Sequence, residues 1–439
     1  MKNLLSRRYI GAPALLWIIL VIGFGLRLAY VLPLDPLTPY GSSGGDEHFY
    51  LDHGYTLVTD QPLPGVDISV LSQPPVYFII VGAARAVFGE AGGVIAVRLI
   101  QALMLTTVAY CAYRLTWRIA DERAGLIAAA FVAINPIFIL DGGKILTETT
   151  YIFFISLGLT VYVDSLAAAS APQRTWGRLA LVGALFGLAT LTRAVLLLFP
   201  LGLALHLLIV YRGRAWGKIG VLLLAYALVV STWTVYNLAR WQRFVIAGEG
   251  LPAFLYMSVV GWDDPFRFDQ QLNENLGQEA SNDMSERQGD YLEAASNQIG
   301  GNIGGYLQRR VGELAGAYLQ PHGTTLFSGE SLRDLVVNWL RDDRSLAGIG
   351  RVIGGEQFFP KLLLYVFHYL ALIFGVIGAW RSRRQWRLTL PLLGFIAYVT
   401  LVHFFLLALP RYIFPTMLCW IVLASSQFKV DSKQLVQKP

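Results

Sequence analysis

The stretch that decides the fold begins at residue 13 and reads PALLWIILVIGFGLRLAYVL to residue 32. It is apolar except for Arg27, and it is long enough to cross a bilayer, which takes about 20 residues. Shortly after it the chain reads GGDEHFY at 44–50, with Asp46 and Glu47 side by side. Carboxylates are costly near hydrocarbon and often functional there. An ordinary hydrated loop can also be acidic. The positions of the other charges in the chain distinguish such a loop from a functional site.

The composition is that of a polytopic membrane protein. Of the 439 residues, 55% are hydrophobic and 15% are charged, whereas soluble domains carry about 25% charged residues. The two cysteines, Cys111 and Cys419, lie in apolar runs and give neither a disulfide framework nor a cysteine metal site. The net charge of +6 predicts no nucleic-acid partner, because the basic residues lie in short loops between apolar stretches.

Apolar stretches of near-spanning length predict an all-α polytopic membrane protein with about ten transmembrane helices. They are expected near 13–32, 93–118, 124–141, 148–168, 177–192, 194–211, 219–238, 361–380, 388–409 and 412–428. The first is expected to be a retained helix and not a cleaved signal peptide, because its core is too long and no small-residue cleavage site follows. A shorter segment, 74–88, opens with two prolines and predicts an interfacial or re-entrant helix.

Lysine and arginine in the short loops predict the orientation. One set of loops is basic and therefore cytoplasmic, and ten spans place both termini inside. The loop 33–73 holds five aspartates and no lysine or arginine, so it is expected outside. We predict a multi-pass protein of a bacterial inner (cell) membrane whose active site faces the periplasm.

Three parts follow from these spans. Residues 1–238 form an N-terminal transmembrane catalytic module with the acidic loop 33–92. Residues 239–360 form an extracytoplasmic region that is partly helical around 284–299 and 305–319. Residues 361–439 form C-terminal transmembrane helices and a cytoplasmic tail. The absence of an internal repeat counts against the duplicated architecture common in secondary transporters.

Four cations break the positive-inside pattern and lie near outer helix ends: Arg27, Lys144, Arg193 and Arg411. Each alone can be explained as a side chain that reaches for the interface. Together, opposite an acidic loop, they predict an anion site, since arginine holds phosphate oxygens in a bidentate fork. A polyprenyl-phosphate would suit this site, with its tail between helices and its head at the outer rim.

Glu148 is a second isolated carboxylate on the same side, and two interpretations of it stay open. Thr147 can cap the fourth helix while a first-turn glutamate complements the helix dipole, or Glu148 can form a structural ion pair with Arg193 or Lys144. Alternatively, Glu148 belongs to the anion site.

Transfer of a sugar from a lipid phosphate would use such a set of groups. Cations stabilise the charge that develops on the departing phosphate. A carboxylate opposite them takes the proton of the attacking acceptor oxygen. Direct displacement in this geometry inverts the anomeric centre, and it needs no nucleotide-binding loop, of which the sequence has no persuasive example.

Four local motifs follow one another in the chain. They are Asp46-Glu47 followed by Tyr50, then Gln73-Pro74-Pro75-Val76-Tyr77, then Leu146-Thr147-Glu148-Thr149, and finally Arg411-Tyr412-Ile413-Phe414-Pro415. In order and placement they resemble the C-type membrane glycosyltransferases, in the branch of the protein O-mannosyltransferases and the lipid A aminoarabinose transferase. The resemblance covers about residues 13–200 and returns at 409–415.

The resemblance implies roles for single residues. Asp46 would be the catalytic base on a loop of juxtamembrane helices over a lipid-donor cavity, Glu47 would help shape the site, and Glu148 would approach it from the fourth helix. The remaining motif residues expected to shape the site are Tyr50, Pro74, Tyr77 and Tyr412. The donor would be a polyprenyl-phosphate-linked sugar, and the acceptor lipid A or core, a cell-envelope glycan, or a protein hydroxyl.

No metal or other cofactor is predicted. The aminoarabinose transferase has a Glu-Lys pair, with roles in metal and phosphate binding, where this chain has Ser72-Gln73. His48, His53 and His322 are expected outside as polar surface, since a lone histidine is seldom a metal site.

Two other classes remain as alternatives. A transporter or flippase of an anionic amphiphile or glycolipid would also use outward cations, but it would normally need charged or broken midplane segments and paired halves. A non-catalytic scaffold could use 239–360 to bind a partner. Replacing Asp46 by asparagine separates these classes, because only a transferase should lose turnover.

Overall fold

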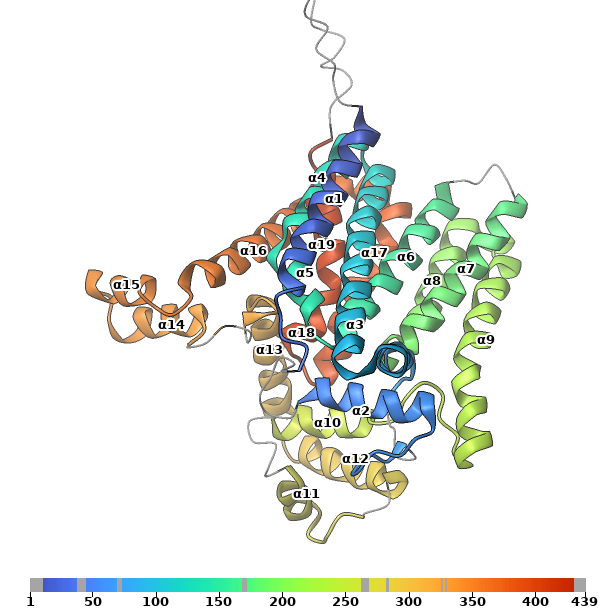
Figure 1. Cartoon of the computed structure of the whole chain (residues 1–439), viewed down its shortest axis with the longest axis vertical. Coiled ribbons are helices and arrows are strands. Elements are labelled where there is room, and N and C mark those ends of the chain that lie inside the picture. Colours follow the sequence, from blue (N-terminus) through green and yellow to red (C-terminus); the bar gives the residue numbers. More distant parts are fainter. Residues whose placement is uncertain are drawn as a thin grey trace, which may run out of the picture.

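The computed structural model describes residues 11–37, 45–68, 73–167, 172–261, 268–281, 284–324, 327 and 330–429. Every regular element within these ranges is a helix, which confirms the all-α prediction. The helices of the main bundle are α1 (Ala12–Val31), α3 (Val76–Ile119), α4 (Glu122–Ile134), α5 (Pro136–Leu140), α6 (Thr147–Ala167), α7 (Pro172–Thr190), α8 (Phe199–Tyr211), α9 (Trp216–Trp241), α16 (Phe358–Arg381), α17 (Trp386–Phe405) and α19 (Met417–Ser426) (Figure 1).

The bundle is that of a multi-pass membrane protein. Six helical segments of the described chain are long and apolar enough to cross a membrane, or seven if a bent pair of helices counts as one span. One of the six, Phe358–Phe405, consists of α16 and α17, which the turn η7 (Ser382–Gln385) joins. The count of ten spans and the orientation stay predictions.

The span expected at 124–141 is not one straight helix. It consists of α4, α5 and the 3-10 turn η2 (Asp141–Gly143), with a bend of 56° at the break. Pro136 cannot continue the hydrogen-bond ladder of α4, and the Asn135 side chain caps α5 by accepting from Ile137 N at 3.2 Å.

Helix α3 is too long for a single crossing of the membrane. Its 44 residues would extend about 66 Å, twice the roughly 30 Å of a hydrocarbon core. It is kinked at Gly89, whose φ of 75° suits glycine. The part before the kink corresponds to the short helix predicted at 74–88. It packs on α2 (Asp46–Thr59) through Gly54 and Gly82, where a Cβ on Gly82 would lie 1.9 Å from the Gly54 carbonyl oxygen.

A layer of shorter helices covers the end of the bundle at which α2 lies, here called the α2 end (Figure 1). The layer holds α10 (Leu251–Val260), α11 (Phe268–Leu276), α12 (Met284–Gly301) and α13 (Ile303–Leu319), around a small core of its own. Helices α12 and α13 coincide with the two helices expected around 284–299 and 305–319. The helices α14 (Leu332–Asp342) and α15 (Leu346–Ile353) instead project sideways from the bundle.

Candidate functional site

The acidic pair of the sequence opens α2, and Asp46 meets a cation from the other end of the chain. Asp46 and Glu47 form the first turn of this helix. Arg411 lies in α18 (Pro410–Ile413) and donates from Nη1 to Asp46 Oδ2 at 2.6 Å. The Asp46 side chain is 50% exposed and that of Arg411 33% exposed, so the pair can be reached by a ligand.

A second ion pair lies beside the first. Arg193 Nη1 donates to Glu148 Oε1 at 3.1 Å, and the Glu148 carboxylate is almost fully buried. The guanidinium carbons of Arg193 and Arg411 lie 4.7 and 5.0 Å from the centre of the Tyr412 ring. This is the pairing that the sequence left open for Glu148, and both arginines lie close to the same aromatic ring.

Glu47 points inward and holds the loop that precedes α6. Its Oε1 accepts from Ile145 N at 2.8 Å, whereas its buried Oε2 has no hydrogen-bond partner among the described residues. Burial raises the pKa of Glu47 to about 7, although the Ile145 hydrogen bond and the charges of Arg98 and Lys144 lower it. The two neighbouring carboxyls therefore have different surroundings, one buried and one open.

Lys144 is buried next to these carboxyls without a direct partner. It is only 4% exposed, and no hydrogen bond or ion pair joins its ammonium group to a residue in the described ranges. Burial lowers its pKa, and the nearby charges of Asp141, Glu148 and Glu47 raise it. A buried cation without a partner is costly, which makes Lys144 a point at which a bound anion would stabilise the protein.

Side chains of α3 fix the loop that carries Lys144. Arg98 Nε donates to Gly143 O at 3.1 Å. Gln101 Nε2 donates to Gly142 O at 3.1 Å and to Lys144 O at 2.7 Å. The position of the ammonium group thus rests on the bundle itself.

A buried network behind Lys144 was not predicted from the sequence. His322 Nε2 lies 3.1 Å from Asp141 Oδ1, and Thr149 Oγ1 donates to Asp141 Oδ2 at 2.8 Å. His322 is buried and is therefore not the polar surface residue that was expected. The motif around Asp141 was visible in the sequence, but nothing there indicated a partner so far along the chain.

The residues expected to shape the site lie around it in a connected chain. Tyr50 OH donates to Gln73 Oε1 at 3.0 Å, and its ring meets that of Tyr77 edge-on with centroids 5.1 Å apart. Tyr77 OH in turn donates to Gln101 Oε1 at 3.0 Å. Pro74 is half-buried just before α3, and Ser72 lies outside the described residues. Gln73, at which the chain departs from the aminoarabinose transferase pattern, thus supports Tyr50.

Arg27 is not joined to the other three cations. It is fully buried, and its Nη atoms donate to Gly23 O at 2.7 Å, Val132 O at 3.1 Å and Ala133 O at 3.3 Å. Two of these carbonyls end α4, where a helix lacks donors of its own. The structure therefore brings together Lys144, Arg193 and Arg411, and it gives Arg27 a place in helix packing.

The described residues hold no group of three or more His, Cys, Asp or Glu side chains placed to bind a metal ion. Asp46 is engaged with Arg411 and Glu47 with the Ile145 amide, so these two carboxylates do not converge on one point. That the protein works without a metal stays a prediction from the sequence.

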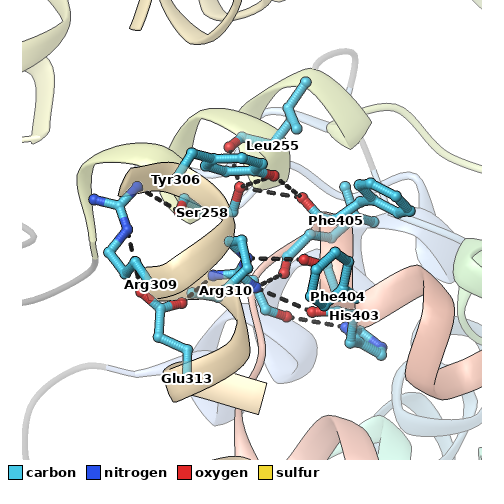
Figure 2. A network of polar contacts seen from close by, with 11 residues as sticks. Leu255, Ser258, Tyr306, Arg309, Arg310, Glu313, His403, Phe404 and Phe405 are labelled. Atoms are coloured by element: carbon cyan, nitrogen blue, oxygen red, sulfur yellow. Dashed lines mark hydrogen bonds and ion pairs between the residues drawn. The ribbon is translucent and has the colours of Figure 1, made fainter. Parts of the chain in front are cut away.

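A polar network ties the outer layer to the segment that leads to Arg411 (Figure 2). Arg310 of α13 is fully buried and donates to the carbonyl oxygens of His403 at 3.0 Å and Phe404 at 2.9 Å, and to that of Leu406. Tyr306 OH and Ser258 Oγ both donate to Phe405 O, at 3.0 and 3.1 Å. Helices α10 and α13 are thereby fixed to the end of α17, a few residues before α18.

Part of the chain is similar to a known protein family. The family model of dolichyl-phosphate-mannose-protein mannosyltransferases matches residues 72–237. None of the curated protein sequences matches the chain.

Solved structures of an archaeal oligosaccharyltransferase share the fold. The oligosaccharyltransferase of Archaeoglobus fulgidus in its apo form is 15% identical with a TM-score of 0.52, over 96% of this chain and 50% of that one. The same enzyme, AglB, with an inhibitory peptide and a dolichol-phosphate gives 15% identity and a TM-score of 0.53 over 94% and 50%. ArnT from Cupriavidus metallidurans is 13% identical with a TM-score of 0.44, over 95% of this chain and 77% of that one.

The chain thus spans about half the length of the archaeal oligosaccharyltransferase that it matches. The match to the mannosyltransferase family model runs from just before α3 into α9. It includes α6, which carries Glu148, and it begins after Asp46 and Glu47. The chain thus shares its fold with the archaeal oligosaccharyltransferase, and its residues 72–237 match the family model of dolichyl-phosphate-mannose-protein mannosyltransferases.

Proposed function

We propose that the protein is an inverting glycosyltransferase that moves a sugar from a polyprenyl-phosphate donor to an acceptor outside the cytoplasm. The observation that carries this proposal is the half-exposed Asp46 paired with Arg411, next to the buried and unpaired Lys144. A carboxylate and an anion site side by side are what a displacement at a sugar phosphate requires.

The proposed reaction is a single displacement. An acceptor hydroxyl oxygen attacks the anomeric carbon and gives its proton to Asp46. The bond between that carbon and the phosphate oxygen breaks, and the polyprenyl phosphate leaves with the electron pair. Lys144 and Arg411 stabilise the charge that grows on the leaving oxygen, while Arg193 stays paired with Glu148 beside them.

Polar atoms without partners mark where the donor phosphate would bind. Arg411 Nε and Tyr151 OH are buried without a hydrogen-bond partner among the described residues. The Arg193 guanidinium lies 5.7 Å from the centre of the Tyr151 ring. Buried polar groups are nearly always satisfied in folded proteins, so an anion that accepts hydrogen bonds here would remove a cost of the free protein.

The proposed order of events follows from the ion pair. In the free protein Arg411 holds Asp46 Oδ2. A phosphate that binds Lys144 competes for Arg411, because arginine prefers bidentate contact with phosphate. Asp46 is then released to accept the proton of the acceptor, so the base is freed when the donor is in place.

The donor and the compartment rest on likeness and on charge pattern. The matching family model is named for dolichyl-phosphate-mannose, and the oligosaccharyltransferase AglB, which shares the fold, was solved with a dolichol-phosphate. The basic loops favour a bacterial inner membrane with the α2 end outside. The acceptor is a lipid A or core sugar, a cell-envelope glycan or a protein hydroxyl.

The test compares glycolipids and glycoproteins from cells with and without this protein by mass spectrometry, which identifies product and sugar together. Asp46→Asn should abolish the product as a deletion does. Asp52 lies in the same helix and pairs with Arg85, and Asp52→Asn should leave the amount of product unchanged. Purified Arg411→Ala in nanodiscs should bind undecaprenyl phosphate more weakly than the unchanged protein.

Three outcomes would contradict the proposal. Cells that carry Asp46→Asn as their only copy of the protein could still form the product. Arg411→Ala could bind undecaprenyl phosphate as well as the unchanged protein does. Reporter fusions at residues 60 and 300 could report the cytoplasm, which would remove the predicted orientation.

A further inference from the structure

Helices α14 and α15 form a hairpin that stands apart from the rest of the outer region. Figure 1 shows both beside the bundle, beyond the start of α16, whereas α10–α13 cover the α2 end. The main contacts of α14 are with α15 and α16, and Arg333 Nη1 also lies near Gly316 of α13. The hairpin therefore has one side on the protein and another side open.

The shape of the hairpin is held by its own side chains. Ser331 and Ser345 cap the two helices by accepting from Asp334 N at 3.1 Å and from Gly348 N at 3.0 Å. Trp339 Nε1 donates to Ser345 O at 3.0 Å across the turn. These bonds define the ends of the two helices and the turn between them.

One face of this hairpin is apolar and exposed. Leu346 is 86% exposed, although leucine is usually buried in proteins. The other large apolar side chains exposed on the two helices are Val336, Val337, Leu340 and Ile353. Charged residues share the remaining surface: Arg333, Asp334, Arg341, Asp342, Arg344 and Arg351. Short helices with one apolar face and one charged face are typical of the membrane interface.

The apolar face is continuous with a membrane-spanning helix. Only residues 354–357 separate α15 from α16, and α16 belongs to a segment that is apolar enough to span a membrane. The start of α16 exposes Phe359, Leu362, Leu363 and Val366. Because a span must enter the bilayer at its end, this connection holds the hairpin at the level where lipid headgroups begin.

We propose that the α14–α15 hairpin is an interfacial anchor that lies in the headgroup region of the bilayer beside the bundle. Val336, Leu340, Leu346 and Ile353 face the acyl chains, and the arginines on the rim face lipid phosphates. The proposal concerns the lipid bilayer as the partner, and it holds whether or not the protein transfers sugars.

The test places a nitroxide label on each face of the hairpin in the full-length protein, reconstituted in nanodiscs of phosphatidylcholine and phosphatidylglycerol. The labelled variants are Leu346→Cys on the apolar face and Asn338→Cys, an exposed residue on the opposite face of α14. The two native cysteines, Cys111 and Cys419, are buried, so the label reacts at the introduced thiol. Accessibility to oxygen, which enters lipid, is compared with accessibility to a water-soluble nickel chelate.

The label at 346 should be reached by oxygen and protected from nickel, and the label at 338 should show the reverse. Equal nickel accessibility at both positions would place the hairpin in water and overturn the proposal. A label at 346 that is shielded from both reagents would also overturn it, because it would indicate a second copy of this chain or another protein on this face.

Discussion

Replacing Arg310 should release the outer helical layer from the bundle, because its guanidinium closes the end of α17. Arg310 is fully buried and donates to His403 O at 3.0 Å, to Phe404 O at 2.9 Å and to Leu406 O (Figure 2). Carbonyls in the last turn of a helix have no donor within the helix, and a cation there also complements the helix dipole. We expect Arg310→Gln to remove most of this connection.

The magnitude follows from the number of bonds. A hydrogen bond to a charged group contributes about 1.5–3 kcal/mol, and a buried carbonyl left unpaired costs about 1–3 kcal/mol. Glutamine is shorter, uncharged and has two N–H donors, so at least one of the three carbonyls loses its partner and the others lose a charged one; the loss should be about 4 kcal/mol. This corresponds to a roughly 1,000-fold increase in the opening equilibrium of the layer, at about 1.4 kcal/mol per factor of ten.

The adjacent residue provides the matched control. Arg309 is 40% exposed, forms a surface ion pair with Glu313 and donates to Ser258 O at 3.1 Å. Exposed pairs of this kind contribute about 0.2–1 kcal/mol. Arg309→Gln should therefore change the opening equilibrium by less than about tenfold.

Hydrogen–deuterium exchange of the protein in nanodiscs measures both variants. Peptides from α13 and from residues 406–413 should lose protection by about three orders of magnitude in Arg310→Gln, while peptides from α3 and α6 stay protected. Equal protection of α13 in the two variants would refute the reasoning, because it would mean that the buried bonds to α17 do not hold the layer.

Three further predictions concern α2 and its neighbours. Gly82→Ala should lower the thermal unfolding midpoint and product formation, because its Cβ would lie 1.9 Å from Gly54 O and overpacking costs about 1–3 kcal/mol. Gly25→Ala, which has open space around it, should change neither. The pKa of Glu47 rises from 4.5 to about 7 on folding. The stability that its proton adds, on the order of 3 kcal/mol, is therefore complete below pH 4.5 and is lost as the pH rises through 7. Glu47→Gln should flatten the resulting fall in the unfolding midpoint between pH 5 and 8. Lys144→Met should raise the unfolding midpoint of the free protein, because it removes a buried unpaired cation, and it should abolish the stabilisation that undecaprenyl phosphate gives.

The parts that could be predicted from the sequence are those that depend on local pattern. Apolar stretches located the bundle helices to within a few residues, and α12 and α13 lie where polar helical segments were expected. The pairing of Glu148 with Arg193 had been named as one alternative, since both residues were expected at the same membrane face. The bend in the third apolar stretch, 124–141, has a local cause as well, because Asn135 and Pro136 interrupt the hydrogen-bond ladder of the helix.

Contacts between distant parts of the chain could not be predicted in this way. Arg27 looked like one more outward cation, but its Nη atoms donate to α4 carbonyls more than 100 residues away. Arg310 lies in a helix that was expected in water, and no local pattern shows that it meets the end of α17. His322 looked like surface because the burial of a lone histidine depends on where its segment packs. In each case the partner is a backbone carbonyl or a single carboxylate, which leaves no mark on the surrounding sequence.

The distribution of charge in the site favours one bound anion. Asp46 with Arg411 and Glu148 with Arg193 each combine one negative and one positive group. Lys144 adds a positive charge that no described residue pairs directly. A phosphate at Lys144 would complete this set, and it could do so only by drawing on Arg411, the one member whose side chain is a third exposed. The same exchange would leave Asp46 free at the moment when an acceptor needs a base. On the proposed mechanism the Asp46–Arg411 pair therefore links donor binding to proton transfer, since the half-exposed carboxylate is held by the more exposed of the two paired arginines.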